Sequence, residues 1–117
     1  MKTDTSDADF TGRDVEMSTD TIFELLLDVR RRYTLYYLPV ANGTVTVDRL
    51  ADRVRQLEGD PSPNEYDRVR ADLHHRHLPA LAAAGIVRYD PVTGTVDRLP
   101  MADRLEPYLD LSRTADL

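Results

Sequence analysis

The sequence contains no cysteine and no long apolar run. Without cysteine, the chain cannot form disulfides, thiolate nucleophiles or Cys-ligated zinc and iron–sulfur sites. It also lacks the 18 consecutive apolar residues of a transmembrane helix and the charged-then-apolar N-terminus of a secretory signal. We therefore expect a soluble, cytoplasmic protein that does not associate with a membrane.

Lysine is nearly absent, with one lysine against fourteen arginines, and sixteen aspartates outnumber five glutamates. This bias is typical of proteins from salt-loving archaea, although a GC-rich genome encoding an ordinary acidic domain would give the same bias. The net charge of −6 is concentrated at the ends, with −3 on residues 1–17 and −2 on residues 101–117. Only −1 remains for residues 18–100, so the acidic total does not exclude a nucleic-acid partner.

The 117 residues suit a single domain with one modest core. Residues 1–17 are polar, aspartate-rich and without periodicity, which predicts a disordered acidic tail. The periodic apolar patterns fall within residues 18–100, which we take as the folded domain. Residues 101–117 contain Pro107, so we expect a helical segment of only one or two turns and a frayed end.

Helical spacing of apolar residues predicts three helices with N-caps at Thr21, Asp28 and Thr46, and a longer helix over residues 63–84. Pro39 is expected to end the second helix. Pro79 lies inside the long helix and should kink it, because proline has no backbone N–H to donate. Gly85 is expected to end the long helix by adopting the left-handed conformation.

Three further segments have the composition and spacing of β-strands. Residues 44–46 suit a small edge strand, and residues 86–90 and 95–99 flank a turn that contains proline and glycine. Two helices joined by a short turn and followed by a hairpin predict an α+β fold of the winged helix-turn-helix type, with three to four helices and a C-terminal β-hairpin wing. The predicted core residues are Leu26, Leu35, Leu38, Leu50, Val54, Val69, Leu73, Leu81, Ile86 and Val96.

Three motifs carry a resemblance to a known family. They are Asp28, Arg31, Leu35 and Leu38 in one helix, Val47, Leu50 and Ala51 in the next, and His77, Leu78, Leu81, Ala84, Gly85, Ile86 and Val87 at the end of the long helix. Over residues 20–99 the chain resembles the ArsR-like winged helix-turn-helix regulators, in particular a haloarchaeal branch. The resemblance implies a transcriptional regulator that binds operator DNA as a homodimer. The metal-sensing cysteines of some members are absent, and residues 64–67 replace the usual Ser/Thr-rich start of the reading helix.

Polar residues on the outward side of the long helix and on the hairpin are the candidates for contact with double-stranded DNA. They are Asn64, Arg68, Arg70, His74, His75, Arg76, Arg88 and Arg98. Guanidinium groups can bind phosphates, or bond bidentately to guanine in the major groove. The alternative is a solvated charged face on which Glu65, Asp67 and Asp72 neutralise the arginines in ion pairs along the helix.

Metal binding and catalysis are weakly indicated. The imidazoles of His74 and His77 are one helical turn apart, but no cysteine or carboxylate completes an obvious ligand set. The sequence also lacks a nucleophile elbow, a phosphate-binding loop and a paired-carboxylate motif. We therefore expect a non-enzyme without metal or cofactor, and no motif indicates a small-molecule ligand.

A homodimer interface is expected on the second helix and the C-terminal segment. The candidate residues are Tyr33, Tyr36, Tyr37, Leu105, Tyr108 and Leu109. Tyr36 and Tyr37 are adjacent and large, which favours a subunit contact over joint burial in one small core, although exposed tyrosines can also stack on single-stranded bases. The alternative function is a winged-helix module that binds another protein and does not contact DNA.

Overall fold

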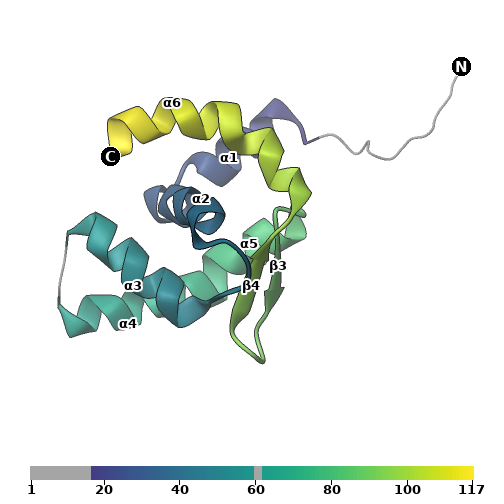
Figure 1. Cartoon of the computed structure of the whole chain (residues 1–117). Helices are drawn as coiled ribbons and strands as arrows, with labels where there is room; N and C mark the ends of the chain where they lie inside the picture. The colour runs from purple at the N-terminus through teal and green to yellow at the C-terminus, as the bar shows by residue number, and fades with distance from the viewer. Residues whose placement is uncertain (1–16, 60–61) are drawn as a thin grey trace, which may run out of the picture.

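The structure is a computed structural model of the chain, and it describes residues 17–59 and 62–117. Over these residues the fold is α+β, with α2 in the middle of the helices and a small antiparallel sheet at one side of them (Figure 1). The helical elements are α1 Thr19–Leu26, α2 Val29–Ala41, α3 Val47–Glu58, α4 Pro63–Asp72, the π-helical η2 Leu73–His77, α5 Leu78–Ala83, the 3₁₀-helical η3 Pro100–Leu105 and α6 Glu106–Asp116. The strands are β2 Val45–Thr46, β3 Val87–Asp90 and β4 Thr95–Arg98. The predicted disordered tail lies outside the described residues, except for Met17.

The N-caps follow the sequence prediction in two helices and differ from it in α1. The Asp28 carboxylate accepts the Arg30 N–H at 2.8 Å at the start of α2, and the Thr46 hydroxyl accepts the Arg49 N–H at 3.1 Å at the start of α3. In α1 the cap is Ser18, which accepts the Thr21 N–H at 3.1 Å, so the predicted cap at Thr21 is wrong. Both hydroxyl residues suit the position, and the sequence alone does not choose between them.

α2 continues through Pro39, which the sequence predicts as its end. The helix runs to Ala41 and ends at Asn42, whose φ of +56° is left-handed. Because Pro39 lies in the last turn, the helix loses only one backbone hydrogen bond there. Asparagine tolerates the left-handed conformation better than most residues, which explains why the chain turns at Asn42.

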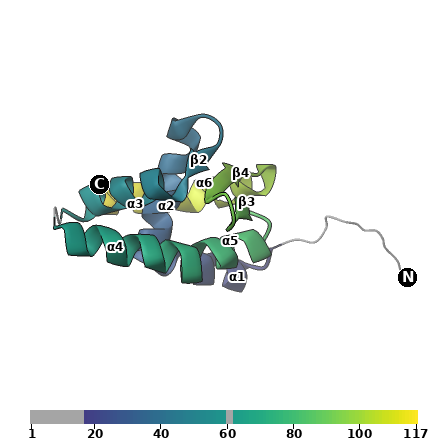
Figure 2. The same cartoon turned by 90° about the horizontal axis from the view of Figure 1, so that it is seen from below.

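α4, η2 and α5 follow one another as one continuous helix, which confirms the long helix predicted over residues 63–84 (Figure 2). Its middle is not regular, because the Leu78 N–H bonds to the Leu73 carbonyl five residues back. Pro79 follows directly, and its ring would crowd the carbonyl of His75 in a regular helix. Where the sequence predicts a kink at Pro79, the structure has a π-helical segment just before the proline.

The long helix ends at Gly85, as predicted. Gly85 has a φ of +78°, and the Ile86 N–H donates to the Leu81 carbonyl at 2.9 Å. This hydrogen bond spans the left-handed residue and satisfies a carbonyl at the helix end. The chain then enters β3.

The strands form one antiparallel sheet in the order β2-β4-β3. Val96 in the central strand β4 is paired with Val45 on one side and with Tyr89 on the other. The predicted hairpin and edge strand are therefore confirmed. At the hairpin turn the Gly94 carbonyl accepts the Val47 N–H at 2.9 Å, which joins the turn to the first residue of α3.

The C-terminal segment is longer and better anchored than predicted. α6 spans 11 residues, because Pro107 lies in the first turn, where a helix needs no N–H donor. Its end is bonded to α2: Arg32 Nε donates to Asp116 Oδ2 at 2.7 Å, and the Tyr36 hydroxyl donates to the same oxygen at 2.6 Å. The expectation of one or two turns with a frayed end is wrong, because α2 supplies partners for the last turn.

All ten predicted core residues are buried. The core also contains residues that periodicity did not select, including Leu78, Leu105, Leu109 and two polar residues, Thr34 and His77. The Thr34 hydroxyl donates to the Arg30 carbonyl at 3.0 Å, which satisfies its hydrogen-bonding capacity inside α2. The core therefore joins the long helix, α2, α3, the sheet and the C-terminal helices.

Candidate nucleic-acid interface

The long helix presents most of the predicted DNA-binding residues on its outer side. Asn64, Arg68, Arg70, His75 and Arg76 are exposed, whereas Val69 and Leu73 on the inner side are fully buried. The 3.6-residue period separates the two sets, as the sequence predicts. The outer side is therefore accessible to a partner over its whole length.

Each exposed arginine of this helix has an acidic partner. Arg68 Nη1 lies 3.4 Å from Glu65, Arg76 Nε lies 3.0 Å from Asp72, and Arg70 Nε contacts Asp48 of α3. The pairing expected as the alternative to DNA contact is thus present in the structure. Exposed pairs of this kind contribute roughly 0.2 to 1 kcal/mol each, so a phosphate can replace the carboxylate at little cost.

His74 connects the long helix to the hairpin. Its Nδ1 lies 2.6 Å from the Tyr89 hydroxyl in β3, and the two ring centroids are 5.9 Å apart. Burial, with a further contribution from Arg70, lowers the pKa of His74 below its ordinary value. His74 is therefore a neutral hydrogen-bonding group at pH 7, which positions the hairpin and does not attract phosphate by charge.

The hairpin places its two predicted arginines differently. The Arg88 side chain is 71% exposed and lies 3.6 Å from Asp97, its cross-strand neighbour. The Arg98 side chain is only 24% exposed, and its Nη2 lies 3.0 Å from Asp103 and 3.2 Å from Glu106. Arg98 thus joins the hairpin to η3 and α6, and only Arg88 remains available at the surface.

A hollow of about 260 Å³ separates the long helix from the hairpin turn. Arg70 and His74 line it from the helix, Thr46 and Asp48 from the start of α3, and residues 91–94 from the turn. Val92 at the turn is 93% exposed. The helix side and the tip of the hairpin therefore flank one concave surface.

Arg49 is an exposed cation that the sequence prediction missed. It follows the N-cap of α3, next to Asp48 in the hollow, and no carboxylate lies within 4.0 Å of it among residues 17–59 and 62–117. Helical periodicity places Arg49 outside the core but does not show that α3 begins beside the hairpin. The hydrogen bond between Val47 and Gly94 and the pairing of β2 with β4 establish that position.

Arg30 in α2 binds three carboxylates from other helices. Its Nε lies 2.6 Å from Glu58, its Nη1 lies 3.4 Å from Asp72, and its Nη2 contacts Glu65. The side chain is 23% exposed, so these pairs are partly shielded from water. We call Arg30, Glu58, Glu65 and Asp72 the interhelical ion cluster, which joins α2, α3 and α4 and serves the fold.

His77 is fully buried beside this cluster. Its Nε2 lies 2.9 Å from Asp72 Oδ2, and its Nδ1 accepts a hydrogen bond from Arg31 Nε at 3.2 Å. Burial lowers its pKa, and this outweighs the opposing effect of Asp28 and Asp72. In the part of the chain that the structure describes, no group of three or more His, Cys, Asp or Glu is arranged to hold a metal ion.

Most predicted dimer residues pack inside the single chain. Tyr36, Leu105 and Leu109 are at most 5% exposed, and Tyr33 is 9% exposed, so these side chains pack in the core of the chain and leave little surface for a second subunit. Tyr36 fits the core because its hydroxyl reaches Asp116 and Ser112 of α6, and because Arg113 covers its ring 4.9 Å from the centroid. Tyr37 and Tyr108 remain partly exposed.

Tyr108, one of the predicted dimer residues, belongs to an exposed apolar surface that also includes residues outside that predicted set. Phe23 of α1 is 54% exposed and meets Tyr108 of α6 edge-on, with ring centroids 5.7 Å apart. Leu111, one helical turn beyond Tyr108, is 77% exposed. We call Phe23, Tyr108 and Leu111 the α1–α6 apolar patch.

The chain was compared with protein-family models, with curated proteins and with solved structures, and only a family model matches it. No curated protein and no solved structure matches it. No described helix has the length and apolar character needed to cross a membrane. The model of the family described as "Domain of unknown function (DUF7344)" matches residues 23–97, which is more than half of the chain and covers α2 through the hairpin. The chain therefore belongs to this DUF7344 family.

Proposed function

We propose that this chain is a winged helix-turn-helix protein of ArsR-like type that binds double-stranded DNA and regulates transcription as a homodimer. In this proposal α3 and the long helix are the helix-turn-helix, and β3 with β4 is the wing. The observation that carries the proposal is the concave surface shared by the outer side of the long helix and the hairpin turn. A helix beside a hairpin suits entry into a major groove with the wing on the adjacent phosphates.

The exposed ion pairs support an exchange mechanism. Arg68, Arg70 and Arg88 would leave their present carboxylate partners and bind phosphate oxygens or guanine edges. Bidentate arginine contacts act at short range, so they persist at about 1 M salt, where the screening length is roughly 3 Å. A protein with the composition of a salt-loving organism can therefore bind DNA despite its net negative charge.

The direct test is selection of bound genomic fragments at high salt, followed by affinity measurements. Arg68→Ala and Arg70→Ala should each weaken binding to a selected fragment by about 1 to 3 kcal/mol. Arg53→Ala is the matched control, because Arg53 is an exposed arginine of α3 that bonds only to Gln56 among the described residues. Equal affinities for all three variants would contradict the assignment of the reading helix.

The homodimer is proposed to form through the α1–α6 apolar patch. Its exposed rings and Leu111 would lose water on pairing with a second copy, and apolar burial contributes about 25 cal/mol per Å². Light scattering should give twice the 13.3 kDa mass of the chain. Phe23→Asp should yield monomers, whereas Val92→Asp at the hairpin tip should leave the dimer intact. A monomer of the unaltered chain at micromolar concentration would exclude this part of the proposal.

A protein-interaction module is the second candidate, and the acidic partners of the reading-helix arginines favour it. Paired arginines give a nearly neutral helix face, which suits a protein partner better than a polyanion. The two functions are separated by the DNA selection: fragments enriched reproducibly favour the regulator, and none enriched at any salt favours the module. Both candidates are binding functions, and we propose no catalytic role or cofactor for either.

A further inference from the structure

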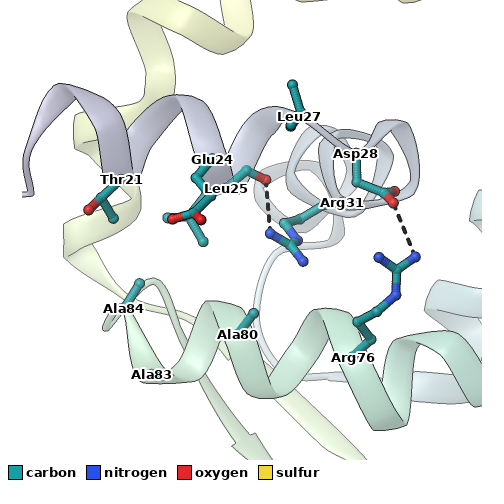
Figure 3. Close-up of a pocket in the computed structure, with 10 residues that line it drawn as sticks. All are labelled: Thr21, Glu24, Leu25, Leu27, Asp28, Arg31, Arg76, Ala80, Ala83 and Ala84. Atoms are coloured by element: carbon teal, nitrogen blue, oxygen red, sulfur yellow. Dashed lines mark hydrogen bonds and ion pairs between the residues drawn. The ribbon is translucent and has the colours of Figure 1, made fainter.

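A pocket lies between α1 and α5, on a different part of the molecule from the hollow beside the hairpin (Figure 3). Its volume is about 700 Å³, and it is a groove open to solvent, not an enclosed cavity. Ala80, Ala83 and Ala84 form its floor, and Leu25 adds an apolar side chain from α1. Alanine side chains leave the space open where longer residues would fill it.

Arg31 projects into this pocket and differs from its two neighbours in α2 (Figure 3). Arg30 and Arg32 pair with carboxylates at 2.6 and 2.7 Å. No carboxylate of residues 17–59 or 62–117 lies within 4.0 Å of Arg31. Its N–H groups instead donate to two neutral acceptors, His77 Nδ1 at 3.2 Å and the Leu25 carbonyl at 3.4 Å.

The cation of Arg31 is incompletely compensated. Burial lowers the pKa of its guanidinium, and the carboxylates of Asp28, Asp72 and Glu24 oppose this only from beyond ion-pairing distance. A partly buried charge without a close counter-ion has lost hydration and gained little in return. An anion placed in the pocket would supply the missing partner through charge-assisted hydrogen bonds.

The other charges of the pocket limit which anion fits. Arg76 and Asp28 form an ion pair at 3.2 Å at the edge of the pocket (Figure 3). Glu24 lines the same side as Arg31, and no described residue pairs with its carboxylate within 4.0 Å. Arg31 and Arg76 are balanced by Glu24 and Asp28, so the charged residues of the pocket sum to zero. Repulsion from the free Glu24 carboxylate grows with the charge of the ligand, so a monoanion on Arg31 is tolerated better than phosphate or a dicarboxylate.

We propose that this pocket binds a small organic monocarboxylate, with its carboxylate on Arg31 and a short apolar chain against Ala80, Ala83 and Ala84. The carboxylate would bond to the guanidinium on the side that faces the pocket. The apolar chain would displace water from the alanine floor.

Binding at this site would act on the long helix. Arg31 donates to His77 of η2, and the alanines belong to α5, so two segments of that helix contact the ligand site. A consequence that rests on the proposed function is coupling between ligand and DNA, in which each changes the affinity of the other by the same factor. The ligand site itself is tested on the protein alone.

The test is an NMR titration of the full chain with 4-methylpentanoate, with its neutral amide, 4-methylpentanamide, and succinate run in the same buffer. We expect saturable shifts of the Ala80, Ala83 and Ala84 amide signals with the monocarboxylate. The neutral amide and succinate should each bind at least tenfold more weakly. Arg31→Gln should reduce the affinity for 4-methylpentanoate at least tenfold, and Arg53→Gln, which removes the same charge from α3, should leave it unchanged.

Ala83→Leu provides an independent test, because it fills the pocket and leaves Arg31 in place. This variant should bind 4-methylpentanoate at least tenfold more weakly than the unaltered chain does. If Arg31→Gln does not fold, the result with Ala83→Leu decides whether the proposal stands. The proposal is overturned if the carboxylate and the amide bind equally, if the shifts lie away from α1 and α5, or if neither variant changes the affinity. A protein that binds the carboxylate and no DNA would refute the proposed function alone.

Discussion

The inner and outer sides of the long helix use the same backbone for different purposes. Val69, Leu73 and Leu81 on the inner side are fully buried. On the outer side, the side chains of Arg68, Arg70 and Arg76 are 73%, 46% and 57% exposed. Buried apolar contacts carry most of the stability of a small domain, whereas exposed ion pairs contribute little. The inner side therefore holds the fold, and the outer side can change partners without unfolding it.

The interhelical ion cluster lies between these extremes. Glu65 and Asp72 project from the long helix toward Arg30, and their side chains are only 14% and 21% exposed. Removing one partner of an ion pair that is partly shielded from water costs more than removing one partner of an exposed pair, because the remaining charges are left uncompensated. The stability cost of substitution should therefore decrease from the inner side to the cluster and then to the outer side.

The largest effect is expected for Leu81→Ala on the inner side. Removing three carbons from a fully buried leucine leaves a cavity, which costs about 2 to 5 kcal/mol. Chemical denaturation of the variant and the unaltered chain measures this difference. An unchanged free energy of unfolding would show that Leu81 is not part of the core. The inner side of the helix would then contribute no more to stability than the outer side.

Arg30→Gln should have an intermediate effect of about 1 to 3 kcal/mol, because it removes charge-assisted hydrogen bonds to Glu58, Glu65 and Asp72. The same denaturation measurement applies, with Arg53→Gln as a control that removes an exposed guanidinium of α3. If both variants lose the same stability, the cluster is no more important than an ordinary surface pair.

Acidification should weaken the fold through His77. Its folded pKa lies below the ordinary value of 6.5, so as the pH falls below 6.5 the unfolded chain takes up a proton that the folded chain does not. Stability should be fully present above pH 6.5 and fall as the pH drops. Asp28 and Asp72, whose pKa values are lowered below 3.8, lose their contribution only at lower pH.

His77→Gln tests the source of this pH dependence, because glutamine can still donate to Asp72 but does not titrate. The decline in stability below pH 6.5 should become shallower in the variant. His74 contributes a remaining decline, since burial lowers its pKa as well. A stability that rises on acidification of the unaltered chain would contradict the neutral state of His77.

The smallest effect on stability is expected for Arg70→Ala on the outer side. Its exposed pair with Asp48 should contribute little to stability, and less at high salt. Thermal melting at low and high salt measures this contribution. A loss as large as that of Leu81→Ala would mean that the outer side is a structural element and not a binding surface.

The spacing of apolar residues and the positions of capping and turn residues predicted much of this fold. The ten core residues, the caps at Asp28 and Thr46, the hairpin and the end of the long helix at Gly85 all follow from the sequence. These features depend on residues within a few positions of one another, where spacing and conformational preference act directly. The same rules failed at Pro39 and Pro107, because proline is tolerated near a helix terminus, and only the structure shows where each terminus lies.

The tertiary structure decided which distant groups meet. Tyr36 can be buried because its hydroxyl forms hydrogen bonds with Asp116 and Ser112, which lie 80 and 76 residues later in the chain. Arg30, Arg31 and Arg32 are consecutive, yet the first binds a cluster of acids, the second faces a pocket and the third holds the C-terminal helix. Neighbouring side chains on a helix point about 100° apart, so each reaches a different part of the fold. The sequence by itself determined where the charges and apolar faces lie along the chain, and packing alone determined their partners.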